Sequence, residues 1–113
     1  MEITLSHDAD YLLCSMYGEY RARIKNGALK EDAKLFGGAE IIQQDIVPEW
    51  PVEDISETSR ELSNVQFLDA LYADDELTES MLTPAAIVYM ENRFANNASA
   101  LLDTLSKLRS IIF

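Results

Sequence analysis

The sequence has few of the residues that build catalytic, metal or disulfide sites. It contains one cysteine, Cys14, and one histidine, His7, among 113 residues. A single cysteine forms no intramolecular disulfide and supplies no pair of zinc ligands, which suits a reducing compartment. The chain also lacks a glycine-rich phosphate loop and a serine elbow. We therefore expect a protein that is not an enzyme and that binds no metal or cofactor.

Long apolar segments are missing as well. No run of 18 apolar residues occurs, so no transmembrane helix is predicted. Met1 and Glu2 do not begin the basic and apolar regions of a signal peptide. These absences predict a soluble cytoplasmic protein without membrane contact. The chain does contain 48% hydrophobic residues, enough for one core, and 20 acidic against nine basic residues, a net charge of −11.

Hydrophobic periodicity predicts a first long helix over residues 7–26. Its apolar positions recur at intervals of three and four, Ser6 is placed as the N-cap, and Asn26-Gly27 supplies a left-handed stop. Cys14 lies close to the apolar stripe of this helix. We expect it to be a small core residue, because no neighbouring base would activate its thiol.

Shorter helices and a hairpin follow in the sequence. The expected segments are helices at residues 30–36, 39–46 and 51–64 and a β-hairpin at residues 67–82. Gly37-Gly38 separates the first two helices, and Trp50-Pro51 opens the third with Trp50 as a packing anchor. The polar turn at residues 74–76 could hold a cation, but it lacks the ligand spacing of an EF-hand, so a solvated turn is favoured.

The last segment begins at Thr83-Pro84, an N-cap followed by a first-turn proline. Its apolar residues form a seam with the spacing of a coiled coil: Ile87, Phe94, Ala98, Leu101, Leu105, Leu108 and Ile112. This stripe either packs on the first helix as core or pairs with a second copy. We expect a homodimer, because the apolar end of the chain would otherwise face water. Its predicted contacts are Leu101, Leu105, Leu108 and Ile112. Asn96-Asn97 could kink or split the helix.

This order of elements is typical of a winged helix-turn-helix protein. The fold class is therefore mainly α with a β-hairpin, with the third helix in the recognition position and the hairpin as the wing. We expect residues 1–95 to form the winged-helix domain and residues 96–113 to form a C-terminal helical extension.

Scattered strings of residues also resemble a known family. They are Asp10-Tyr11-Leu12-Leu13, Glu19-Tyr20, Asn26-Gly27, Phe36-Gly37, Arg60-Glu61-Leu62-Ser63, Leu71-Tyr72-Ala73-Asp74 and Tyr89-Met90-Glu91-Asn92-Arg93-Phe94. The pattern is similar to that of the YjcQ-like proteins, small winged-helix proteins of Gram-positive bacteria and their prophages. The resemblance implies a winged-helix fold and a phage-associated origin. It implies no catalytic or binding residues.

The charge distribution argues against the usual function of this fold. Residues 48–66 carry a net charge of −4 and residues 67–82 a net charge of −5, with no lysine or arginine in the second segment. DNA-binding proteins draw much of their affinity from cations that contact phosphates. We therefore expect a regulatory or interaction module with an unidentified protein partner. Its candidate interaction surface is Glu53, Glu57, Arg60, Glu61, Asp74 and Asp75.

Other interpretations of the charges stay open. A DNA-binding regulator would have its phosphate contacts among Arg21, Arg23, Lys25, Lys30 and Arg60. The first four also suit the dipole at the end of the first helix, and Glu57 and Glu61 flank Arg60 as ion-pair partners. The acidic surface could also imitate DNA, or confer solubility alone.

Overall fold

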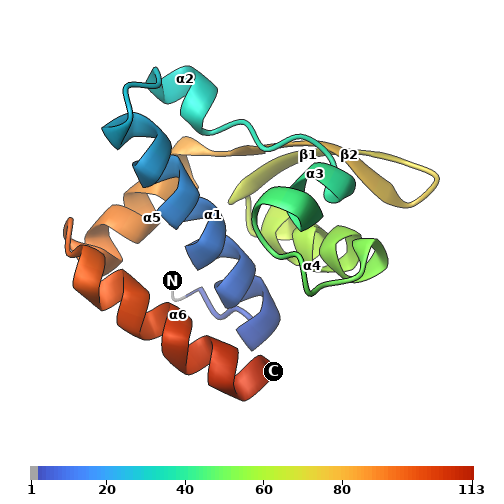
Figure 1. Cartoon of the computed structure of the whole chain (residues 1–113). Helices are drawn as coiled ribbons and strands as arrows, with labels where there is room; N and C mark the ends of the chain where they lie inside the picture. The colour runs from blue at the N-terminus through green and yellow to red at the C-terminus, as the bar shows by residue number, and fades with distance from the viewer. Residues whose placement is uncertain (1–2) are drawn as a thin grey trace.

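Helices form most of the molecule, and one β-hairpin projects from its side (Figure 1). This computed structural model describes residues 3–113. The elements are α1 (His7–Lys25), α2 (Lys30–Ala33), α3 (Ala39–Asp45), α4 (Val52–Asn64), β1 (Leu68–Ala73), β2 (Glu76–Leu82), α5 (Pro84–Phe94) and α6 (Ala98–Ile112). The predicted class, mainly α with a β-hairpin, is confirmed. The order of the elements is compatible with a winged helix-turn-helix.

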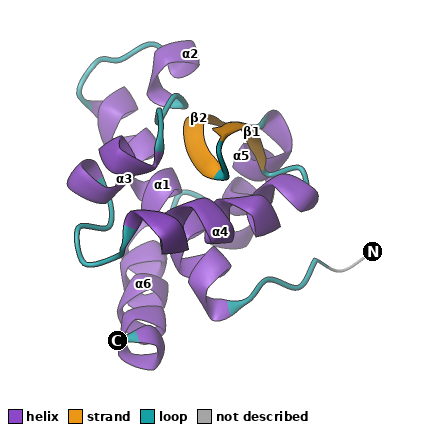
Figure 2. Cartoon of the chain, turned by 90° about the vertical axis from the view of Figure 1, so that its right-hand side faces the viewer, coloured by secondary structure: helices purple, strands orange, loops and turns teal. Residues whose placement is uncertain are grey.

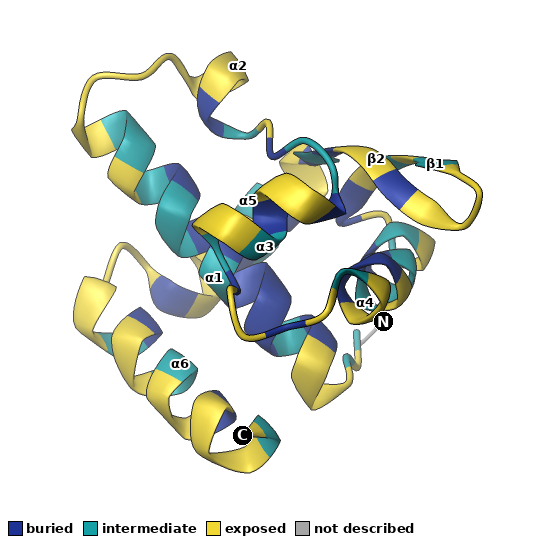
Figure 3. Cartoon of the chain, turned by 45° about the vertical axis from the view of Figure 1, so that its right-hand side comes forward, coloured by how far each residue is buried: buried dark blue, intermediate teal, exposed yellow. Residues whose placement is uncertain are grey.

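α1 lies at the centre of the fold. The hydroxyl of Ser6 accepts a hydrogen bond from the N–H of Ala9 at 3.1 Å, which confirms the predicted N-cap. Gly27, with φ +99°, follows the helix in the left-handed conformation that was expected. α4 packs on one side of α1, and α5 and α6 pack on the other (Figure 3). This enclosure buries α1 on more than the one predicted face, and Cys14 is fully buried within it.

α3 and α4 form a helix pair joined by residues 46–51. Trp50 anchors this connection, as predicted: its ring stacks on Tyr11 with centroids 5.9 Å apart, and its carbonyl accepts a hydrogen bond from Gln43 Nε2 at 2.8 Å. α4 then crosses the molecule beside the hairpin (Figure 2). The connection therefore fixes the helix that carries most of the predicted interaction surface.

β1 and β2 pair in antiparallel register, from Leu68 opposite Leu82 to Ala73 opposite Glu76. The turn is shorter than predicted. Asp74 (φ 51°) and Asp75 (φ 67°) form it alone, because a two-residue turn with two left-handed residues matches the twist of a hairpin. Glu76 is thus the first residue of β2.

An isolated β-bridge corrects the predicted helix over residues 30–36. α2 ends at Ala33, and Leu35 forms a β-bridge with Met81. The backbone N–H of Phe36 donates to Ser80 O at 3.0 Å, so pairing with β2 replaces the helical hydrogen bonds. Gly38 lies so close to β2 that a Cβ there would be 2.9 Å from Leu77 O, which explains the glycine at this corner.

The apolar seam is split at Asn96-Asn97, the alternative that the sequence left open, because the chain reverses between α5 and α6. Ala95 and Asn96 adopt positive φ, and the side chain of Asn97 caps α6 by accepting from the N–H of Ala100 at 3.0 Å. α6 returns along α1 and lies antiparallel to it (Figure 1). The segment predicted as a C-terminal extension, residues 96–113, therefore contributes to the same core.

The residues predicted as dimer contacts pack within the chain. Leu101 and Leu108 are 5% and 6% exposed, and Leu105 and Ile112 are partly buried against the core. Since α6 turns this stripe toward α1 (Figure 3), the alternative reading of the stripe as core is the one observed. The apolar side chains that α6 leaves exposed are Leu102 and Ile111.

Candidate interaction surface on α4 and the hairpin

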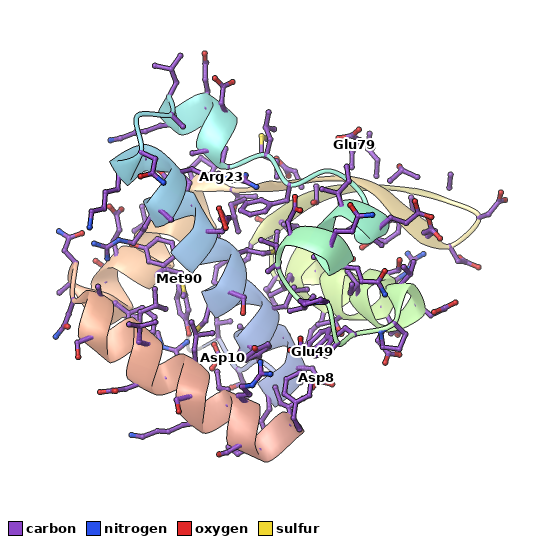
Figure 4. The ribbon with its side chains drawn as sticks, in the orientation of Figure 1. Asp8, Asp10, Arg23, Glu49, Glu79 and Met90 are labelled. Carbon is purple, nitrogen blue, oxygen red and sulfur yellow. The ribbon has the colours of Figure 1, made fainter. Side chains whose placement is uncertain are left out.

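Exposed carboxylates follow the outer side of α4 and continue at the turn of the hairpin. Glu53 and Glu57 lie one helical turn apart and are exposed, and Asp74 and Asp75 at the turn are exposed as well. We call these four residues the acidic face. Glu79 lies on the other side of the hairpin and points away from α4 (Figure 4). Glu79, which was not part of the predicted interaction surface, therefore lies outside the acidic face.

Arg60 joins the turn of the hairpin to α4. Its guanidinium carbon lies 4.0 Å from the centre of the Tyr72 ring, and its Nη2 lies 3.3 Å from Asp75 Oδ1. The prediction that Glu57 and Glu61 would hold Arg60 is wrong, because the aromatic ring and the carboxylate across the interface offer a better geometry than neighbours on the same helix. The one cation of α4 is therefore engaged inside the molecule.

A buried polar network holds the hairpin on α4. Ser59 Oγ donates to Ser56 O at 2.7 Å, so the Tyr72 hydroxyl, 2.7 Å away, donates to Ser59. Ser56 Oγ in turn accepts from the backbone N–H of Leu77 at 3.0 Å. The sequence reasoning missed this network, although two serines three residues apart on an apolar stripe were its signal. The network fixes the acidic turn relative to α4.

Glu61 is engaged elsewhere. Its two carboxylate oxygens accept from the N–H and the hydroxyl of Ser6, each at 2.7 Å. Glu61 therefore links α4 to the start of α1 and does not belong to the free acidic face that was predicted to include it.

Among the predicted phosphate contacts around the end of α1, the structure engages Arg23 within the fold and leaves the lysines exposed. Arg23 Nη1 donates to the carbonyls of Ala33 (3.2 Å) and Leu35 (2.6 Å), and its guanidinium lies 4.5 Å from the Phe36 ring. Arg23 thus secures the segment after α2. Lys25 and Lys30 are exposed, and no lysine takes part in an ion pair among residues 3–113.

Arginine stacking is general in this protein. Each arginine lies over an aromatic ring, at 4.0 to 5.9 Å from its centroid: Arg21 on Tyr17, Arg23 on Phe36, Arg60 on Tyr72, Arg93 on Phe94 and Arg109 on Phe113. Guanidinium groups favour such sites because they are planar and weakly hydrated. The arginines consequently hold the fold together, while most carboxylates remain in water.

The buried thiol offers no nucleophile. Burial, together with the neighbouring carboxylate of Asp10, raises the pKa of Cys14 to about 12. Asp10 itself forms a two-point ion pair with Arg93, at 2.6 and 3.0 Å, which ties α1 to α5. Within residues 3–113, no group of three or more potential metal ligands is found, and no helix is long and apolar enough to cross a membrane.

Comparison with protein-family models, with curated proteins and with solved structures finds no match for this chain. The resemblance to the YjcQ-like proteins therefore stays a prediction. The functional argument depends on the geometry and the charges of the acidic face.

Proposed function

We propose that the protein is a non-enzymatic interaction module that binds a basic segment of a partner protein through its acidic face. The observation that supports this proposal is the engagement of Arg60. Asp75 and Tyr72 hold the one cation of α4, and Glu53, Glu57 and Asp74 take part in no ion pair within residues 3–113. Such a surface steers a basic partner toward it and repels phosphates.

The test is fluorescence anisotropy with a labelled lysine-rich helical peptide. The double variant Glu53→Gln/Glu57→Gln should weaken peptide binding severalfold. A matched control, Asp69→Asn/Glu79→Gln, removes the same charge from the opposite side of the hairpin and should bind like the wild type. Equal weakening in both variants would mean that only the net charge of the protein matters, and the proposal would fail.

DNA binding is the alternative function, supported by the order of the elements, which is compatible with a winged helix. A labelled random duplex therefore belongs in the same titration. Tight duplex binding that falls steeply with salt would replace the protein-partner proposal. Glu61 is unsuitable for this comparison because its substitution would also disturb Ser6 and the start of α1.

A homodimer through α6 remains a further prediction. Since Leu101 and Leu108 are buried in the core, the apolar side chains left for such contacts are Leu102 and Ile111 of α6, 65% and 58% exposed, and Phe113 at its C-cap, 55% exposed. Sedimentation analysis of the wild type and of Ile111→Ser tests it. A monomer at all concentrations would remove the homodimer.

A further inference from the structure

A groove runs between α1, the end of α3 and the first half of α6. Its volume is about 820 Å³, within the range of about 300–1,000 Å³ that is usual for sites of small molecules. None of the four residues of the acidic face lines it. The groove is therefore a separate feature of the surface, and its lining decides what it could hold.

Apolar side chains form much of this lining. They are Ile24 of α1, Ile46 at the end of α3, and Leu101, Leu102 and Leu105 of α6. Leu102 is 65% exposed and stands beside Leu101 and Leu105, so the three leucines form one apolar wall of the groove. An aliphatic chain placed along these residues would leave water, which is the main source of affinity in such sites.

Gly18 keeps the floor of the groove low. A Cβ at this position would lie 3.7 Å from Leu101 Cδ2, an ordinary contact, so α1 and α6 do not need a glycine in order to pack. Glycine also destabilises the interior of a helix relative to alanine. Helix packing therefore does not explain the glycine at position 18, whereas the space that a ligand needs in the groove does.

The polar part of the lining presents an incompletely paired guanidinium. Nη1 of Arg21 is buried and has no hydrogen-bond partner among residues 3–113, and Nη2 reaches only Asn96 O, at 3.5 Å. Lys25, one helical turn further along α1, also lines the groove and is exposed. Because a buried donor without an acceptor costs free energy, Arg21 is suited to receive an anionic oxygen from a ligand.

The remaining charges do not cancel this preference. Glu19 lines the groove, but it lies 3.6 Å from Arg23 Nε and is engaged there. Asp45 and Glu91 also line the groove, together with the cations Arg21, Lys25 and Lys30. The first turn of α6 contains no acidic residue, so its helix dipole adds positive potential. In a chain with a net charge of −11, this groove is a region where the cations are not outnumbered.

We propose that the groove binds a small amphipathic carboxylate. Its head accepts hydrogen bonds from Arg21 and pairs with Lys25, and its aliphatic body lies along Ile24, Leu101 and Leu105. The requirement for a negative head follows from the unpaired guanidinium, and the requirement for an apolar body follows from the leucines of α6. This site is independent of the proposed partner surface, so either can fail without the other.

Decanoate is a suitable probe, titrated into the full chain by calorimetry and followed by amide chemical shifts. We expect saturable binding with shifts at Gly18, Ile24 and Leu101. Leu102→Asp places a carboxylate in the groove and should weaken decanoate about tenfold or more. Leu71→Asp is the matched control, because Leu71 is equally exposed, at 65%, but lies on the hairpin. Equal weakening by both variants, or no saturable binding to the wild type, would overturn the proposal.

The charge of the head is tested separately. Arg21→Gln should weaken decanoate about tenfold and leave decanol unchanged, because only the carboxylate uses the guanidinium. Lys25→Gln, at an exposed site, gives a second test if Arg21→Gln does not fold. Lys107→Gln on α6 is the control for net charge, since Lys107 does not line the groove. If decylammonium binds as tightly as decanoate, the assignment of a negative head is wrong.

Discussion

The two sides of this molecule use charge in opposite ways. On the side of α4 and the hairpin, the carboxylates of the acidic face are exposed, and the cation Arg60 is held between Tyr72 and Asp75. On the side of α1 and α6, Asp10, Glu19 and Glu49 form ion pairs with arginines, and the exposed Lys25 takes part in none. We accordingly propose a basic partner for the first side and an acidic ligand for the second.

Because the two sides differ in which charges are engaged, the net charge of the whole chain is a poor guide to what each surface binds. All five arginines stack on aromatic rings, so they contribute to the fold before they contribute to any surface. The arginines are thus engaged with aromatic rings, whereas the lysines take part in no ion pair within residues 3–113. Binding preferences therefore follow the few charges that remain without an intramolecular partner.

The largest expected effect concerns α6, which carries one wall of the second side. Leu101→Ala should lower the free energy of unfolding by about 2–5 kcal/mol, because it leaves a cavity between α6 and α1. Urea denaturation at two protein concentrations measures this. The neighbouring Leu102→Ala, at an exposed site, should change stability by less than about 0.5 kcal/mol. A midpoint that depends on protein concentration would assign Leu101 to a dimer interface instead.

The next effect concerns the attachment of the hairpin to α4. Ser56→Ala leaves the buried N–H of Leu77 without its acceptor and should cost about 1–3 kcal/mol. It should also speed the hydrogen exchange of that amide more than that of amides in α1. Ser63→Ala, on the same helix but without a hydrogen bond to the hairpin, is the control. An unchanged exchange rate at Leu77 would show that packing alone holds the wing.

Local signals in the sequence predicted the helix ends well. Ser6, the Asn26-Gly27 stop and Thr83 act through hydrogen bonds and backbone conformations within a few residues, and all three were predicted. α4 ends at Asn64, as predicted, and Gln66 two residues later adopts positive φ. Capping is readable from sequence because its energy is local.

Contacts between distant segments were not readable in this way. Leu35 lies in a sequence that favours a helix, but pairing with Met81 overrides that preference. Ala95 is a good helix former, yet it takes a left-handed conformation where the chain reverses. Arg60 was assigned to its helical neighbours and instead contacts Tyr72 and Asp75. For Leu35 and Arg60 the tertiary partner determined the outcome, and no local pattern identifies that partner.

Reversing the charge of the acidic face tests whether its carboxylates are what opposes DNA binding on this side of the molecule. Glu53→Lys/Glu57→Lys should give duplex DNA binding at low salt that is about tenfold tighter than that of the wild type, with the salt slope rising by about 0.9 for each new phosphate contact. Asp69→Lys/Glu79→Lys makes the same change in net charge on the other side of the hairpin. If both variants gain equally, attraction by total charge explains the effect. If neither gains, the acidic face is not what opposes DNA binding.

The smallest expected effect concerns the ion pair between Arg109, near the end of α6, and Glu49. Arg109 donates to Glu49 at 2.8 Å, and this hydrogen bond holds the pKa of Glu49 below its usual 4.5. Because the folded-state pKa is lowered, the pair stabilises the protein above pH 4.5, and this contribution is lost as the pH falls through the lowered pKa. Arg109→Gln should return the pKa of Glu49 toward 4.5 in a carboxyl NMR titration. The stability difference between this variant and the wild type should be small at neutral pH, because both side chains are exposed, and should shrink in acid. A Glu49 titration unchanged by the substitution would show that the ion pair does not persist in solution.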